Sequence, residues 1–231
     1  MSDAFTAGYI GMDSRMKLIE IVTNNLANLQ TTGFKTDFGR LLESEKSLTV
    51  GSNIDMVSGE IGYTGNDLDV AIDGPGFFAV QTPGGVRYTR NGSLSLNESG
   101  DLVTKDGMKV LSTSGSPINA RGLNVAIQDG GIVTVDGNEV ATLKLVSFRN
   151  NTELQREGAN RFVWTGAADG VQDVELPMMK GRALEHSNVN PTMEMVRLMT
   201  AYRDFESVQK SVRTIDSEMN GRLIQELGRL T

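Results

Sequence analysis

Apolar residues near the start of the chain recur at alternating steps of three and four. The series runs Phe5, Tyr9, Met12, Met16, Ile19, Thr23 and Leu26. This spacing is an a/d heptad with one polar member, and it predicts a helix with a narrow coiled-coil seam. The pattern stops at Asn28, and Gly33 follows as a residue that can adopt positive φ where a helix ends. We therefore expect a helix of roughly 27 residues and about 40 Å.

A second amphipathic segment occupies the end of the chain. Asn190 is a suitable N-cap, Pro191 fits a first helical turn, and Glu194 follows near the positive end of the helix dipole. Apolar positions then recur at steps of three or four, at Met195, Leu198, Tyr202, Phe205, Val208, Val212, Ile215, Met219 and Leu223. Long amphipathic helices need partners, so we expect the two seams to pair with each other or with neighbouring molecules. An intramolecular hairpin packed on the rest of the chain is the alternative.

The segment between the predicted helices has a different pattern. Short runs of β-branched and aromatic residues alternate with Gly, Asn and Asp, and residues 41–190 hold 20 of the 26 glycines. This pattern is typical of short antiparallel strands joined by tight turns. Residues 37–66 show no clear period and are predicted to form an extended connector.

These patterns together predict an α+β fold. Long N- and C-terminal helices would pair as a coiled-coil-like α domain, next to a central antiparallel β domain and the extended connector. The expected parts are an N-terminal helix in residues 1–36, a linker in 37–66, the β domain in 67–186 and a C-terminal helix in 187–231.

Composition then narrows the chemistry. The chain has 22 basic and 29 acidic residues, a net charge of −7, and so lacks the basic surface that nucleic-acid binding requires. Cysteine is absent and histidine occurs once, as His186, which excludes thiolate catalysis, cysteine-based zinc sites and iron–sulfur ligation. We predict no catalytic, cofactor-binding or metal site, and no small-molecule substrate.

Targeting signals are equally sparse. No apolar window approaches the roughly 18 residues of a membrane span, and the first ten residues contain no Lys or Arg. We expect neither a membrane-embedded chain nor a cleaved signal peptide.

Three short motifs carry a resemblance to a known family. Residues 24–28 and 31–35 read NNLAN and TTGFK at the end of the first predicted helix, residues 69–74 read DVAIDG, and residues 184–190 read LEHSNVN before the last helix. Together they resemble bacterial flagellar rod and hook proteins, although His186 stands where glycine is frequent in that family. The motif residues are Asn25, Leu26, Ala27, Asn28, Thr32, Gly33, Phe34, Lys35, Ser187, Asn188, Val189 and Asn190.

The resemblance implies a structural, non-enzymatic subunit of the flagellar basal-body rod. The Asn190–Pro191 junction is most similar to that of the proximal rod, and the distal rod is the alternative. Such subunits would stack as a helical axial tube in the periplasmic rod and transmit torque to the hook. The implied partners are copies of this chain, other rod proteins and the type III export apparatus.

The resemblance also implies that the seams form the assembly interface. The seam residues are Phe5, Tyr9, Met12, Met16, Ile19, Leu26, Met195, Leu198, Tyr202, Phe205, Val212, Ile215 and Met219.

Two other classes of protein are also compatible with the sequence. A secreted carbohydrate-active β-sandwich enzyme would use paired carboxyl groups such as Asp101 and Asp106. An adaptor or chaperone would bind partner helices through the methionine-rich start of the last helix, and it would form a discrete complex instead of a polymer.

Overall fold

The computed structural model describes residues 2–44, 47–158 and 160–227, which form two compact units. We call them the terminal unit, which comprises Met1–Ala27, Asp37–Ile54 and Asn190–Thr231, and the central unit, which comprises Asn28–Thr36 and Asp55–Val189. The terminal unit contains the helices α1 (Ser2–Ala27) and α2 (Pro191–Leu227) and the strands β1 (Asp37–Ser44) and β2 (Ser47–Ile54).

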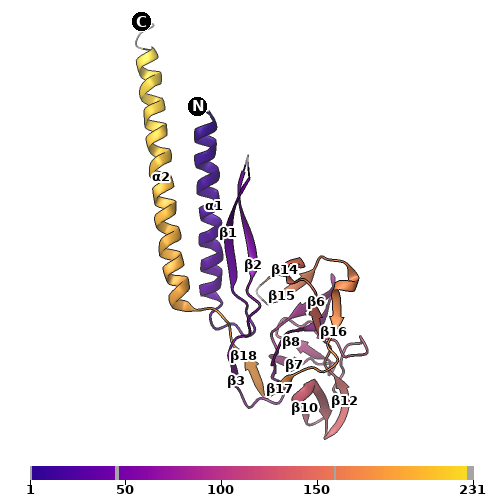
Figure 1. The fold of residues 1–231 in the computed structure, drawn as a ribbon. Helices are drawn as coiled ribbons and strands as arrows, with labels where there is room; N and C mark the ends of the chain where they lie inside the picture. Colours follow the sequence, from indigo (N-terminus) through magenta and orange to yellow (C-terminus); the bar gives the residue numbers. More distant parts are fainter. Residues whose placement is uncertain (1, 45–46, 159, 228–231) are drawn as a thin grey trace. The chain divides into compact units, whose positions relative to one another are not determined.

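The two helices of the terminal unit run antiparallel beside each other, and the β1–β2 hairpin lies along α1 (Figure 1). The hairpin is antiparallel, with a register that extends from the pair Asp37 and Ile54 to the pair Ser44 and Ser47. The first turn of α2 is capped, because the Oδ1 atom of Asn190 accepts a 3.1 Å hydrogen bond from the Met193 N–H.

Small residues set the contact between the helices. A Cβ atom on Gly8 would lie 2.6 Å from Cγ2 of Val212, and one on Gly11 would lie 3.6 Å from Cγ1 of Val208. The backbone of α1 therefore packs directly against valine side chains of α2. Gly11 and Val22 are buried, so the buried face of α1 is displaced by about one residue from the predicted seam.

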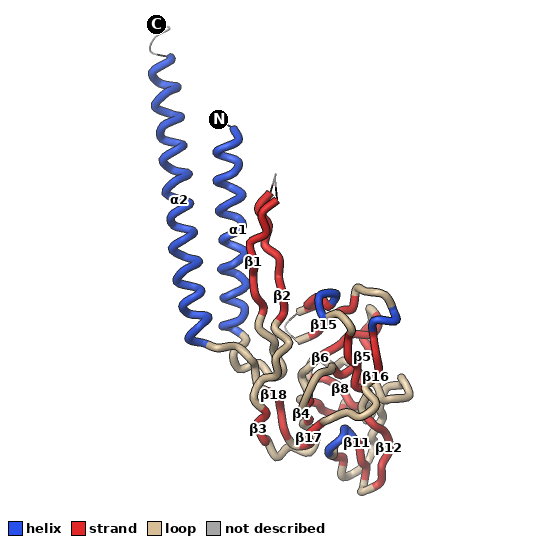
Figure 2. Tube along the Cα trace, in the orientation of Figure 1, coloured by secondary structure: helices blue, strands red, loops and turns tan. Residues whose placement is uncertain are grey.

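The central unit consists of short antiparallel strands (Figure 2). Their bounds are β3 (Ile61–Tyr63), β4 (Val70–Ile72), β5 (Phe77–Thr82), β6 (Gly85–Thr89), β7 (Leu94–Leu96), β8 (Leu102–Thr104), β9 (Lys109–Val110), β10 (Val125–Ile127), β11 (Ile132–Val135), β12 (Asn138–Thr142), β13 (Leu145–Phe148), β14 (Leu154–Glu157), β15 (Arg161–Trp164), β16 (Val171–Asp173), β17 (Met179–Gly181) and β18 (Ala183–Glu185). Three single turns of 3₁₀ helix, at Asp129–Gly131, Asn151–Glu153 and Ala168–Gly170, connect some of them.

The largest sheet orders its strands β14-β15-β6-β5-β9-β8-β7, and β13 pairs with both β5 and β16. Separate pairings join β10, β11 and β12, β17 with β4, and β18 with β3. The hairpin between β11 and β12 turns at Asp136 and Gly137, whose φ values of 50° and 86° fit the turn that an Asp-Gly pair favours.

One continuous apolar core fills the central unit. Its largest fully buried members include Ile72, Phe78, Leu102 and Leu143. A neighbouring aromatic group is built on Phe77, Tyr88, Phe148, Phe162 and Trp164, with centroid separations of 4.8 to 5.4 Å between the contacting rings. The glycine-rich middle of the chain therefore has a hydrophobic core of its own.

The predicted fold class is wrong in two respects. The chain is mostly β with terminal helices, and the helices do not form a coiled-coil-like domain of their own, because α1 also packs on the β1–β2 hairpin and contacts α2 through glycine. The predicted connector is also wrong, since residues 37–44 and 47–54 form the paired strands β1 and β2, and residues 61–63 form β3. Continuous cross-strand hydrogen bonding satisfies the backbone there without an obvious period in the sequence.

Candidate functional site

In the terminal unit, one amide joins α1 to the hairpin and to α2. Asn25 is fully buried; its Nδ2 atom donates to the Asp37 carbonyl at 2.7 Å, and its Oδ1 atom accepts from the Asp37 N–H at 3.0 Å. The same Nδ2 atom donates to the Glu194 carboxylate at 3.0 Å. A buried amide with this many partners fixes the positions of three elements at once.

Glu194 is itself buried, with 1% of its surface exposed. It forms an ion pair with Arg197 one turn later on α2. The Arg197 guanidinium lies over the ring of Phe38, 4.5 Å from the centroid, and so links α2 to β1. The charge of Glu194 is therefore compensated inside the terminal unit.

A groove of about 350 Å³ opens beside this cluster, between α1, β1 and α2. Leu18 and Val22 of α1, Phe38 of β1, and Val196 and Ala201 of α2 supply most of its apolar lining. The polar lining residues are Asp37, Thr200 and Asp204, together with the paired Glu194 and Arg197. The groove has the dimensions of a site for a few side chains.

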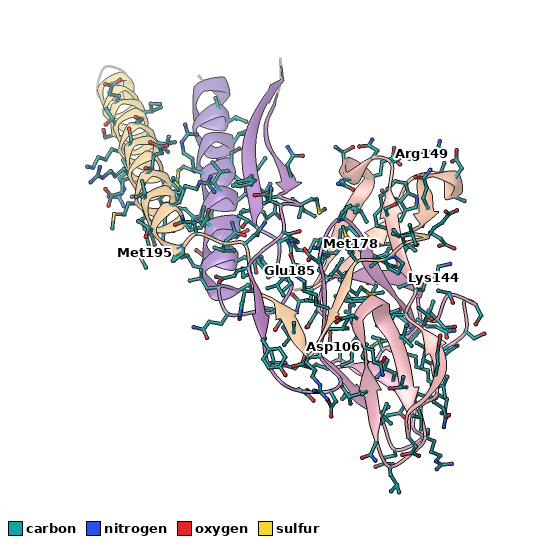
Figure 3. The ribbon with its side chains drawn as sticks, turned by 60° about the horizontal axis from the view of Figure 1, so that its bottom comes forward. Asp106, Lys144, Arg149, Met178, Glu185 and Met195 are labelled. Atoms are coloured by element: carbon teal, nitrogen blue, oxygen red, sulfur yellow. The ribbon has the colours of Figure 1, made fainter. Side chains whose placement is uncertain are left out.

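In the central unit, a buried carboxylate binds two cations. The Nζ atom of Lys35 lies 2.6 Å from Oε1 of Glu185, and Nη2 of Arg90 lies 2.8 Å from Oε2. All three side chains are at most 3% exposed. Figure 3 labels Glu185, which comes from the end of β18. Its Oε1 atom also accepts the Gly59 N–H at 2.8 Å, so the carboxylate is fully hydrogen-bonded.

The two cations of this cluster have further partners. Lys35 donates to the Val57 carbonyl at 2.7 Å, and burial lowers its pKa although the hydrogen bond that it donates to Glu185 raises it. Arg90 donates to the carbonyls of Gly74 and Gly76, both at 2.7 Å. The cluster thus joins chain segments that are far apart in the sequence, and it is a structural clamp.

The other motif residues of the central unit surround this clamp. Gly33 has a φ of 67°, and a Cβ atom there would lie 2.6 Å from the Arg90 carbonyl, so glycine is required. Phe34 is fully buried under the Arg156 guanidinium, 4.5 Å from its ring centroid. Asn188 accepts from the backbone N–H and hydroxyl of Thr36 at 2.7 and 2.8 Å.

The remaining motif residues have local roles. Asn28 Oδ1 accepts the Thr31 hydroxyl at 3.0 Å, and Ser187 Oγ accepts the Val189 N–H at 3.3 Å. Leu26 and Thr32 are half-buried, Ala27 is exposed, Val189 is buried, and Asn190 caps α2. The motif residues therefore do not form one site; they fasten each of the two units internally.

The predicted seam residues divide by exposure. Tyr9 and Met16 on α1 are 67% and 51% exposed, and Met195 and Tyr202 on α2 are 53% and 55% exposed. The half-buried members are Met12, Ile19, Leu26, Leu198, Phe205, Val212 and Ile215. The side chains of Phe5 and Met219 lie outside the described residues. The exposed methionine Met195 is labelled near the start of α2 in Figure 3.

The carboxyl pair considered for a glycosidase does not have the required electrostatics. Hydrogen bonds from Lys109 and Asn119 lower the pKa of Asp101 to about 2, whereas a general acid needs a raised pKa. Asp106 is exposed and lies 3.7 Å from Arg161.

His186 is exposed, with its ring against Gly62. Within the described ranges, no group of three potential metal ligands is present, and no helix could span a membrane.

Comparison with known proteins decides between the remaining classes. A family model described as the flagellar hook protein FlgE/F/G D1 domain matches residues 71–142, and one described as the flagellar basal body rod FlgEFG protein C-terminal region matches residues 180–226. The flagellar basal-body rod protein FlgF of Caulobacter vibrioides is 33% identical, over 96% of this chain and 98% of its own. The chain belongs to the flagellar basal-body rod protein family.

Other relatives of this rod-family protein are named FlgG instead of FlgF. The basal-body rod protein FlgG of Buchnera aphidicola (subsp. Schizaphis graminum) is 31% identical over 95% of this chain and 96% of its own. FlgG of Bacillus subtilis is 30% identical over 96% of both chains. Membership of the family assigns the protein a structural role in the flagellar rod, and the enzyme interpretation is not favoured.

Several structural residues of this rod-family protein were not predicted as a group. Glu185 lies inside the motif at residues 184–190, but its pairing with Arg90 spans 95 positions and no local pattern indicates it. Arg156 and Phe38 lie outside the motifs quoted from the sequence. Glu194 was expected only to interact with the helix dipole, whereas it is buried against Asn25.

Proposed function

We propose that this rod-family protein is a subunit of the proximal rod and assembles through its terminal helices into an axial tube that transmits torque to the hook. The observation that carries the proposal is the row of exposed apolar side chains on the two helices. Tyr9 and Met16 on α1, and Met195, Met199 and Tyr202 on α2, are each more than half exposed. Large apolar side chains exposed along the same elements are typical of protein interfaces.

The contrast with the central unit supports this use of the helices. The central unit buries its apolar core within itself, so its fold does not depend on a neighbour. The helices instead leave long apolar side chains in water, where their burial against another molecule would be favourable. Copies of this chain and other rod proteins are the partners that we propose for that surface.

The assignment to the proximal rod and the proposed export route rest on the sequence and on the relatives. The Asn190–Pro191 junction resembles that of the proximal rod, and relatives named FlgF and FlgG match the chain over similar lengths. We propose export through the flagellar type III apparatus to the periplasmic rod; a chain free of cysteine suits transport in an unfolded state.

The test replaces two exposed seam residues with aspartate, as Met195→Asp combined with Tyr202→Asp. Because both side chains are exposed, the isolated protein should fold with an unchanged melting temperature. At an assembled interface, the two carboxylates would be buried without partners, so the protein should be lost from purified basal bodies and the cells should not swim. Immunoblots of basal bodies and swimming assays measure both effects.

The matched control is Leu123→Asp, which introduces the same charge at an apolar residue of the central unit that is 94% exposed. This variant should be incorporated normally. Basal bodies that contain normal amounts of the Met195→Asp, Tyr202→Asp protein would contradict the proposed interface. The half-buried Leu198 and Phe205 are less suitable, because a charge there would also disturb packing inside the terminal unit.

A further inference from the structure

The groove and the exposed apolar residues lie on different sides of α2. Six residues of α2 line the groove: Glu194, Val196, Arg197, Thr200, Ala201 and Asp204. The apolar stripe that we define as Met195, Met199 and Tyr202 is displaced around the helix axis by roughly half a turn from the centre of that lining, at 3.6 residues per turn. The helix therefore presents a hollow on one side and projecting side chains on the other.

The same division applies to α1. Leu18 and Val22 line the groove, while the exposed Tyr9 and Met16 lie well over a third of a turn away around the axis. The helices are antiparallel, and both direct their groove-lining residues toward β1. Their exposed apolar residues therefore share the side of the helix pair that faces away from β1.

We propose that the groove of one copy receives the Met195, Met199 and Tyr202 stripe of the next copy. This inference rests on the proposed self-assembly and names the two surfaces that meet. Because the surfaces differ, the contact is heterologous: each bound copy still offers a free groove on one side and a free stripe on the other. Such a contact extends into an open helical array and does not stop at a dimer.

Two features favour a second copy of this chain as the occupant. The apolar lining of the groove, from Leu18, Val22 and Phe38, suits flexible methionine side chains and a tyrosine ring. The charges are also complementary, since Asp204 lies at the groove and Arg203 follows Tyr202 beside the stripe. Head-to-tail contact brings the Arg203 side of one copy toward the Asp204 side of the next.

Neighbouring residues allow a sharp test, because the chain contains no cysteine. Cells would express two full-length copies with different epitope tags, one carrying Met199→Cys from the stripe and the other Thr200→Cys from the groove. Both side chains are exposed, so neither substitution should alter the fold. Mild oxidation of isolated basal bodies should produce a disulfide-linked dimer that carries both tags.

Cells that express two differently tagged Met199→Cys copies, or two Thr200→Cys copies, provide the controls and should give little dimer. A dominant dimer between two Met199→Cys copies would indicate an isologous contact and overturn the inference. Cross-linking of Thr200→Cys to a different protein would overturn the choice of occupant. If the chain is present in basal bodies but no mixed dimer forms, the inference fails alone; absence of the chain from basal bodies would contradict the proposed function itself.

A charge exchange gives a second readout in the same cells. Arg203→Asp, introduced into both cysteine-carrying copies, should reduce the mixed dimer by about two- to fivefold, the range of an exposed ion pair. Adding Asp204→Arg to both copies should restore the yield, because the complementary charges are then exchanged between the two surfaces. Failure of the second change to restore the yield would contradict the proposed pairing.

Discussion

The terminal and central units each bury a glutamate, but they use it differently. In the terminal unit, Glu194 is compensated by Arg197 one turn away and by Asn25. In the central unit, Glu185 pairs with Lys35 and Arg90, which lie 150 and 95 positions away in the sequence. Both glutamates therefore have partners far away in the sequence, since Asn25 and Glu194 are 169 positions apart. The units differ in their apolar residues: the central unit buries them in a core of its own, whereas the terminal unit leaves several of them in water.

The largest expected effect follows from removing the carboxylate of the central unit. Glu185→Ala would leave two buried cations uncompensated, and the free energy of unfolding of the central unit should fall by about 3–5 kcal/mol. Glu175→Ala removes an exposed carboxylate of the same unit and should change it little. Chemical denaturation followed by the fluorescence of Trp164 measures both. A loss below about 1 kcal/mol for Glu185→Ala would show that the clamp is not a major source of stability.

The corresponding change in the terminal unit is Asn25→Ala. It removes the partners of the Asp37 backbone and one donor to the buried Glu194, which should cost about 2–3 kcal/mol. Helical circular dichroism should then melt earlier while Trp164 fluorescence reports an unchanged central unit. The exposed neighbour Asn24 provides the control, as Asn24→Ala. Equal destabilisation of both units by Asn25→Ala would mean that they do not unfold separately.

A smaller loss of stability should separate the cost of a positive φ from the cost of a steric clash at two glycines. Gly33 and Gly107 have similar φ values of 67° and 78°, but only Gly33 has backbone atoms where a Cβ would lie. Gly107→Ala should cost about 1 kcal/mol from its left-handed conformation alone, and Gly33→Ala about 1–3 kcal/mol. Thermal unfolding of both variants measures the difference. Equal losses would show that the Arg90 carbonyl can move away from residue 33.

The smallest effect concerns the acid sensitivity of one carboxylate in the central unit. The hydrogen bond from Lys109 lowers the pKa of Asp101 to about 2, below its value in the unfolded chain. The carboxylate therefore contributes to stability above pH 4, and this contribution is lost as the pH falls from about 4 to about 2. The difference in stability between the parent protein and Asp101→Asn should shrink over that window. A stability difference between the two proteins that does not change with pH would contradict the lowered pKa of Asp101.

Local sequence determined the character of each region. The apolar period and the Asn190–Pro191 cap predict helices at both ends, and the abundance of glycine with Asn and Asp predicts short strands between them. The motifs at residues 24–35 and 184–190 were sufficient to indicate the family. These features depend on interactions within a few residues of each other, which is why they can be recognised without a structure.

Tertiary structure decided which partners the elements have. The paired strands β1 and β2 lie in a segment without clear period, and β4 pairs with β17 more than a hundred positions later. The side of α1 that is buried depends on Gly8 and Gly11, since their lack of a side chain allows α2 to approach there and leaves the more apolar Tyr9 and Met16 exposed. Apolar period alone favours the larger side chains as the contact face, but the free energy of packing depends on how closely two backbones can come together, which only the folded chain determines.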